Sequence, residues 1–184
     1  VSIVPGGGNN ISPNGNKMVI SAYQEPYDPK EGGDLWTIPL DGGMPTRLTK
    51  DETYEGYPCW STDGKWIAFI DEKTKKNDYP AIYIVPTEGG EVRQITTEAD
   101  SLGEGAITFS PDGKEFYFTR YTPDRNIWVC RLKDEVWQKP EPASFNTNYR
   151  EISPHIIADG NMLFFASTRP HPKRRGDPKD WSRW

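Results

Sequence analysis

Short apolar runs separated by polar turns extend along the whole chain. Four of them are especially clear, at residues 18–20, 66–69, 116–118 and 162–165. Each run is too short for a helix, and no stretch places apolar residues three and four positions apart as an amphipathic helix does. Short apolar runs bounded by turns are typical of β-strands. The pattern therefore predicts an all-β protein.

Each of these runs follows a turn sequence that recurs at intervals of 47 to 49 residues. The turns lie at residues 12–15, 61–64, 110–113 and 158–160, and they end in Gly15, Gly64, Gly113 and Gly160. Asn or Asp followed by Gly supplies the positive φ angles of a type I′ turn. We therefore expect a tight type I′ hairpin in every repeat.

Two further strands complete the repeat. The third strand is expected at residues 35–38, 82–85 and 127–130, and the fourth at residues 46–49 and 92–96. Four antiparallel strands in about 48 residues fit a propeller blade, a small sheet that buries its faces by stacking on its neighbours. We predict an all-β β-propeller of four-stranded antiparallel blades, with about four blades at residues 1–50, 51–98, 99–145 and 146–184.

Two repeats depart from this pattern. The third lacks the Gly-Gly turn between its outer strands and reads Lys-Asp-Glu-Val-Trp at residues 133–137, which suggests a looser outer hairpin. The fourth is expected to be incomplete, so that the chain forms part of a ring. Unpaired blade edges favour association, and we therefore expect the chain to self-associate through them.

Large side chains recur at matching positions of the repeats. The three sets are Trp36, Tyr83 and Trp128; Trp60, Phe109 and Ile156; and Phe69, Phe118 and Phe165. Because they lie in the middle of strands, we expect them to fill the wedge between blades. The alternative, a platform on which sugars stack, requires exposed rings at the mouth of the channel.

The second repeat resembles the TolB-type β-propeller repeat. Residues 57–69 read Tyr-Pro-Cys-Trp-Ser-Thr-Asp-Gly-Lys-Trp-Ile-Ala-Phe, and residues 88–96 read Glu-Gly-Gly-Glu-Val-Arg-Gln-Ile-Thr. That family's blade has a Trp-Ser-Pro-Asp-Gly-Lys turn, an Ile-Ala-Phe strand, an Asp-Gly-Gly turn and an Arg-x-Leu-Thr end. The resemblance implies a propeller of six or more blades, acting as a periplasmic or envelope-associated binding scaffold.

Charge and composition narrow the choice of partners. The formal net charge is −5. Residues 169–184 carry six Lys or Arg and two Asp, a balance of +4, so residues 1–168 carry −9 and have no footprint for a phosphate backbone. No apolar run approaches the roughly 18 residues that span a membrane. We therefore expect neither nucleic-acid binding nor membrane insertion. Cys59 and Cys130 fall at different depths of different repeats, where a disulfide between them is improbable.

The sequence shows no catalytic constellation. It contains no Gly-x-Ser-x-Gly, no His-Glu-x-x-His, no Cys-x-x-Cys and no phosphate-binding loop. Its two histidines are His155, which aligns with Cys59 and Thr108, and His171, which lies in a basic loop. The chain is therefore predicted to be non-enzymatic and to have no cofactor, with a calcium ion at the channel mouth as the alternative left open.

Three functions are compared. The leading hypothesis is a non-catalytic scaffold that binds a protein partner or a small ligand at the channel mouth. The second is the propeller of a larger prolyl-oligopeptidase-type serine peptidase, which selects substrates while another domain does the chemistry. The third, an acidic-sugar lyase, needs histidine ligands that two histidines scarcely supply.

Three glutamates mark the predicted binding site. Glu55, Glu104 and Glu151 each stand nine residues before the turn glycine, at the start of the innermost strand. In a propeller this position rims one mouth of the channel. One interpretation is that each carboxylate bonds a backbone amide or an Arg within its own blade. The other is that the three attract a cation or a basic segment of a partner.

Overall fold

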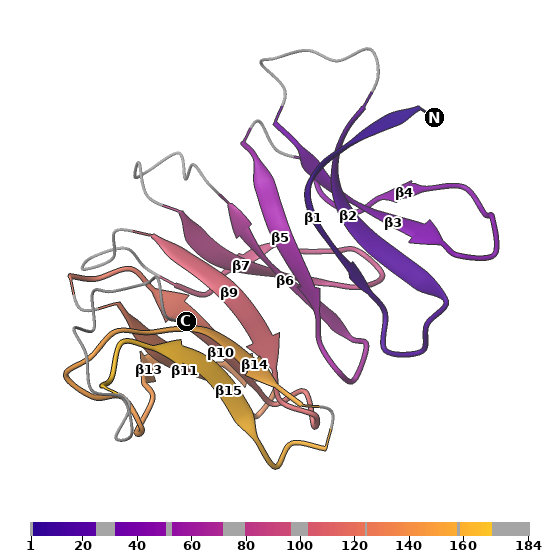
Figure 1. Ribbon diagram of the computed structural model, residues 1–184. Helices are drawn as coiled ribbons and strands as arrows, with labels where there is room; N and C mark the ends of the chain where they lie inside the picture. The colour runs from indigo at the N-terminus through magenta and orange to yellow at the C-terminus, as the bar shows by residue number, and fades with distance from the viewer. Residues whose placement is uncertain are drawn as a thin grey trace.

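The computed structural model describes residues 2–24, 32–50, 53–71, 80–96, 103–123, 125–157 and 159–170. Within these ranges the regular structure consists of β-strands, and they form four antiparallel sheets that follow one another in chain order (Figure 1). The predicted all-β propeller architecture is confirmed.

The strands of each sheet are consecutive in the chain. The first sheet contains β1 (Ile3–Ile11), β2 (Lys17–Gln24), β3 (Asp34–Pro39) and β4 (Thr46–Arg47). The second contains β5 (Glu55–Trp60), β6 (Trp66–Asp71), β7 (Ala81–Pro86) and β8 (Arg93–Gln94). The third contains β9 (Glu104–Phe109), β10 (Glu115–Arg120), β11 (Asn126–Lys133), β12 (Val136–Trp137) and β13 (Glu141–Pro142). The last pairs β14 (Glu151–Ile156) with β15 (Leu163–Ser167).

The first strands of the sheets lie side by side. β1 contacts β5, β5 contacts β9, and β9 contacts β14, while the later strands of each sheet extend away from this row (Figure 1). The sheets are thus propeller blades that share an inner wall formed by β1, β5, β9 and β14. Any functional group on these four strands faces or borders that wall.

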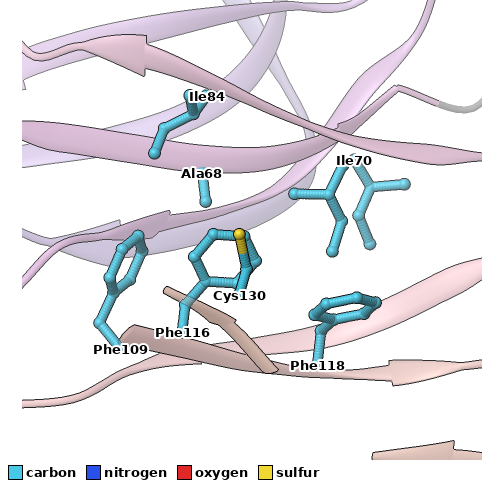
Figure 2. Packing of buried hydrophobic residues seen from close by; sticks show 8 residues of the cluster. Ala68, Ile70, Ile84, Phe109, Phe116, Phe118 and Cys130 are labelled. Carbon is cyan, nitrogen blue, oxygen red and sulfur yellow. The ribbon is translucent and has the colours of Figure 1, made fainter. Parts of the chain in front are cut away.

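The core lies between successive blades. The cluster between the second and third blades gathers Ala68, Ile70, Ile82, Ile84, Phe109, Phe116, Phe118 and Cys130, most of them labelled in Figure 2. A second cluster joins Val19 and Leu35 of the first blade to Trp60, Ile67, Phe69 and Val85 of the second. Trp60, Phe69, Phe109 and Phe118 therefore fill the space between blades, as predicted, whereas Trp36 packs within the first blade. Of the aligned set, Tyr83, Trp128, Ile156 and Phe165 are half-buried and the others are buried.

The inner hairpin turns differ from the prediction. Gly15, Gly64, Gly113 and Gly160 have φ angles between 68° and 74°, as a left-handed position requires. However, Asp63 and Asp112 do not have positive φ, whereas a type I′ turn needs two positive angles. The amide of Gly64 donates to the carbonyl of Ser61 at 2.9 Å. The turn is therefore a type I turn followed by a left-handed glycine, and the type I′ assignment was wrong.

The outer hairpin of the third blade is also tighter than predicted. Leu132 pairs with Trp137 and Lys133 with Val136, so only Asp134 and Glu135 form the turn. Both have positive φ, 51° and 60°, which is the type I′ geometry. The expectation of a looser hairpin was wrong. It assumed that glycine is needed for a tight turn, whereas Asp134 and Glu135 adopt the left-handed angles.

The last described blade has an open face. Phe164 and Met162 are 55% and 54% exposed. They lie on the face of the last blade that corresponds to the face of the second blade on which Ala68 and Ile70 pack against the third. Their position matches that of a blade surface without a neighbour in the described part of the chain. The described residues include no helix that is long and apolar enough to cross a membrane. His171 and Trp181 lie outside the described residues.

Candidate functional site

A bulge interrupts the innermost strand of every blade. The pairing register shifts between Pro5 and Asn9, between Gly56 and Cys59, and between Ile152 and His155. The third blade has the same irregularity opposite Tyr117 and Thr119. Bulges re-aim side chains and occur next to functional sites. The four bulges therefore lie in one row along the inner wall.

The residue at each bulge has a left-handed backbone. These residues are Gly8, Tyr57, Ala106 and Ser153, with φ angles of 93°, 52°, 51° and 55°. Only glycine adopts such angles without strain, so three of the blades hold a non-glycine residue in a costly conformation. All four residues are exposed, and Tyr57 is 57% exposed. The bulges thus present side chains to solvent from the inner wall.

The alignment of the repeats did not identify this row of bulge residues. Tyr, Ala and Ser do not favour positive φ, and only Gly8 carries a compositional signal for it. The one signal available was the spacing, since Gly8, Tyr57, Ala106 and Ser153 each precede the turn glycine by seven residues.

The three predicted glutamates stand at the start of the same strands, but they are buried. Glu55, Glu104 and Glu151 are 3%, 4% and 0% exposed. They are not exposed on a rim. Glu55 and Glu104 accept hydrogen bonds from the preceding blade, whereas the carboxylate of Glu151 is bonded by the loop before it and by its own blade. Whether they also bind a cation or a basic partner segment remains a hypothesis.

Glu104 has the most complete set of partners. Its Oε1 accepts hydrogen bonds from Arg120 Nε at 2.9 Å and from Arg120 Nη2 at 2.7 Å, within its own blade. Its Oε2 accepts from the Ile82 amide at 3.2 Å and from the Thr96 hydroxyl, both in the preceding blade. Burial raises the pKa of Glu104, against the Thr96 hydrogen bond and the positive charge of Arg120. The carboxylate therefore ties two blades together.

Glu151 repeats this arrangement in the last blade. Its carboxylate accepts from the Thr147 hydroxyl at 2.6 Å, from Ser167 Oγ at 3.3 Å and from Arg169 Nε at 3.0 Å. Burial opposes ionisation, but the hydrogen bonds from Thr147 and Arg169 hold the pKa of Glu151 below its usual value. Arg169 thus takes the role that Arg120 has in the third blade.

Glu55 accepts no hydrogen bond from an Arg or Lys within the described ranges. It accepts a hydrogen bond from the Thr49 hydroxyl of the preceding blade, and its partner in the strand pairing is Asp71. Burial raises the pKa of Glu55 to about 8, against the Thr49 bond and with the negative charges of Asp34 and Asp71 adding to the rise. The carboxyl of Glu55 is therefore protonated over much of the neutral range.

A second series of contacts also joins successive blades. Asn10 Oδ1 accepts a hydrogen bond from the Trp60 amide at 2.9 Å, and Thr108 Oγ1 accepts from the Ile156 amide at 3.2 Å. The Cys59 sulfur accepts from the Phe109 amide in the same way. His155 occupies the same position in the last blade and is exposed. Both cysteines are free.

No metal centre is formed by the described residues, since no three His, Cys, Asp or Glu side chains among them are placed to hold an ion. The expected calcium ion at the channel mouth remains a prediction that a titration would test. The site thus consists of hydrogen bonds between blades, ion pairs within blades and exposed bulge residues on the inner strands.

Comparison with known proteins identifies the repeat. A family model described as the TolB beta propeller domain matches residues 6–174. Among solved structures, TolB from Acinetobacter baumannii superposes with a TM-score of 0.61 at 19% identity, covering 86% of this chain and 37% of that one. The likeness at this identity is one of fold.

Two curated relatives are named as peptidases. A protein of Streptomyces coelicolor named as a tricorn protease homolog is 44% identical over 64 residues, which are 34% of this chain and 5% of the relative. Dipeptidyl-peptidase 5 of Porphyromonas endodontalis is 26% identical over 90% of this chain and 26% of its own length. The chain thus spans only a small part of each relative.

Proposed function

The chain belongs to the TolB β-propeller family, since the family model matches most of it, and from this premise we propose that it is a non-catalytic binding module of the bacterial cell envelope. Its partner, a protein or a small ligand, would bind at the inner wall and its mouth. The periplasmic or envelope location rests on the family resemblance.

The row of strained bulges supports this proposal most directly. Tyr57, Ala106 and Ser153 hold left-handed angles that no turn requires, and such strain concentrates at functional positions. Tyr57 adds a large exposed ring with a polar end, a side chain enriched in protein interfaces. The bulges direct this ring away from the core and toward a binding partner.

Panning of a phage-displayed peptide library against the chain tests the proposal. Selected peptides should bind the wild type and lose binding to Tyr57→Ser, because the ring supplies the main apolar contact. Val92→Ser is a matched control, since Val92 is also an exposed hydrophobic residue but lies outside the inner wall. Peptides that tolerate Tyr57→Ser as well as Val92→Ser would contradict a site at the inner wall.

A second function is favoured by the relatives. Proteins named as a tricorn protease homolog and as a dipeptidyl-peptidase share this repeat, which supports a substrate-selecting propeller in a larger serine peptidase. In that case the chemistry resides in a separate hydrolase domain. The sequence of the parent gene distinguishes the two functions, because a peptidase requires a nucleophile elbow outside these 184 residues.

The glutamate hypothesis is tested separately. If Glu55, Glu104 and Glu151 attract a cation, calcium should raise the melting temperature of the wild type and not that of the triple Glu→Gln variant. If the two proteins respond equally to calcium and to a basic peptide, the carboxylates have only the structural hydrogen bonds already described.

A further inference from the structure

The turn between β1 and β2 carries the only Asn-Gly dipeptide of the sequence, Asn14-Gly15. Asparagine is a thermolabile residue, and it is most labile before glycine, because no side chain then shields the following peptide nitrogen. Both residues are exposed. The other three inner turns have Asp at the same position, as Asp63, Asp112 and Asp159. The first blade thus carries the amide form of a residue that is a carboxylate in the other blades.

The Asn14 side chain makes the same contacts as those carboxylates. Its Oδ1 accepts hydrogen bonds from Ser12 Oγ at 2.8 Å and from the Asn16 amide at 3.3 Å. Asp63 accepts the two equivalent bonds at 2.6 and 3.1 Å, and Asp112 accepts them at 2.6 and 3.0 Å. Both bonds are shorter for the carboxylates than for the amide, as charge-assisted hydrogen bonds are. The turn is therefore suited to a carboxylate at position 14.

The first turn packs less tightly against its neighbour than the second turn does. A β-carbon on Gly113 would lie 2.9 Å from Asp63 Cγ, so the second turn lies directly against the third blade. A β-carbon on Gly64 would meet nothing within 4 Å, so the corresponding contact between the first turn and the second blade is missing. The turn that contains Asn14 is therefore free to open locally without displacing the second blade.

Deamidation of an Asn-Gly dipeptide proceeds through a ring. The Gly15 nitrogen attacks Cγ of Asn14; a bond forms between these two atoms, the Gly15 nitrogen loses its proton, and the side-chain nitrogen leaves as ammonia. The product is a five-membered succinimide, and water then opens it at one of its two carbonyl groups. The overall reaction consumes one water molecule, releases one ammonia and leaves either aspartate or isoaspartate at position 14.

The closed turn opposes the first step of this reaction. The Gly15 amide donates to the Ser12 carbonyl at 2.9 Å, and the Ser12 hydroxyl and the Asn16 amide hold Asn14 Oδ1 in place. The Gly15 nitrogen has to turn toward the Asn14 side chain before it attacks, and this movement breaks its hydrogen bond to Ser12. The rate of deamidation therefore depends on how often the turn opens.

We infer that Asn14 is a site of spontaneous deamidation, that opening of the β1–β2 turn controls its rate, and that the aspartate product forms the turn of the other blades. The Ser12 hydroxyl and the Asn16 amide then donate to a carboxylate, as their counterparts do to Asp63 and Asp112. The isoaspartate product has one more carbon atom in the backbone, so it does not fit this turn. The modification is independent of the proposed binding site on the inner wall.

Peptide mass spectrometry of the chain kept at pH 8, either folded or unfolded in urea, tests the inference. Asn14 should be converted to the acid at least about tenfold more slowly in the folded chain than in urea, because the folded turn must open first. Asn16 is the internal control and should stay intact, since it is exposed in the same turn but precedes Lys17 instead of glycine. An intact Asn14 in urea, equal rates in the two conditions, or equally fast conversion of Asn16 would each overturn the inference.

A second measurement concerns the aspartate product. Asn14→Asp should raise the melting temperature at pH 7 by about 1–3 °C, because charge-assisted hydrogen bonds are stronger than neutral ones. Hydrogen bonds, above all the one from the Ser110 hydroxyl, hold the pKa of Asp112 below its usual value, so the gain from a carboxylate in the equivalent place should disappear in acid. Asn16→Asp adds the same charge to the turn and should give no gain, since Asn16 Oδ1 accepts only a long hydrogen bond of 3.4 Å. An Asn14→Asp variant no more stable than the wild type, or a gain that persists in acid, would overturn the assignment of the product.

Discussion

Glu55 faces Asp71 across the β5–β6 pairing, at the position where the next blade pairs Glu104 with Arg120. Two buried carboxylates thus occupy a place that elsewhere holds an ion pair, and they are 3% and 6% exposed. Like charges disfavour ionisation, and the charges of Asp34 and Asp71 add to the rise that burial gives the pKa of Glu55. We therefore expect the stability of the second blade to depend on pH.

Glu55→Gln should remove a loss of stability at high pH. Because burial and the charges of Asp34 and Asp71 raise the pKa of Glu55 to about 8, the folded state binds more protons than the unfolded state above the ordinary carboxyl pKa of 4.5. Its stabilising effect is complete below that value and is lost as the pH rises through about 8. The variant should therefore be more stable than the wild type at pH 9, by at least about 1 kcal/mol.

Urea unfolding of both proteins at pH 5 and pH 9 measures this effect. At pH 5 the two should be close in stability, because both side chains are then neutral. Glu91→Gln serves as the control, since Glu91 is exposed and lies in the outer turn. If wild type and Glu55→Gln differ in the free energy of unfolding by the same amount at pH 5 and pH 9, Glu55 does not cause the loss of stability at high pH.

Glu104→Gln should have the opposite effect. It leaves Arg120, which is 8% exposed, without the carboxylate that accepts two of its hydrogen bonds. Removing one partner of a buried ion pair costs about 3–5 kcal/mol. Glu115→Gln breaks an exposed pair with Arg131 on the same blade and should cost less than about 1 kcal/mol. Chemical denaturation of the two variants measures these losses of unfolding free energy. Equal losses would show that burial does not make the Glu104–Arg120 pair stronger than the Glu115–Arg131 pair.

The repeat could be predicted because the residues that define it are those that the fold constrains most. The glycine of each inner turn has a left-handed angle, and the aromatic positions fill the space between blades. Both requirements recur in every blade, so their spacing was visible without a structure. The same spacing located Glu55, Glu104 and Glu151 on the innermost strands.

The partners of these residues could not be predicted in the same way. Glu104 bonds Thr96 and Ile82 of the preceding blade, and contacts between blades depend on how the sheets stack. The bulge at Tyr57 was hidden because tyrosine does not favour its angle. The open space beside Gly64 exists because no side chain of the first blade packs there, and no local sequence pattern predicts such an absence of packing.

The two cysteines should resist thiol reagents while the chain is folded. Burial raises the pKa of Cys59 and of Cys130 to about 12, and the thiolate is the reactive form. At pH 8 both should react with Ellman's reagent only at the rate of unfolding, and both should react at once in urea. Rapid labelling of either thiol in the native protein would show that the junction between the second and third blades, where both cysteines pack, opens locally.

The inner turn glycines provide the last prediction. Gly64 and Gly113 have similar left-handed angles of 73° and 68°, so replacing either by Val strains the backbone and should cost about 1–3 kcal/mol. Gly113→Val should cost more than Gly64→Val, because its β-carbon would lie 2.9 Å from Asp63 Cγ, whereas that of Gly64 meets nothing within 4 Å. Asn tolerates left-handed angles better than Val, so Gly64→Asn is the control and should lose less stability than Gly64→Val. Urea unfolding of the three variants gives the order, and equal losses at the two glycines would contradict the difference in space around them.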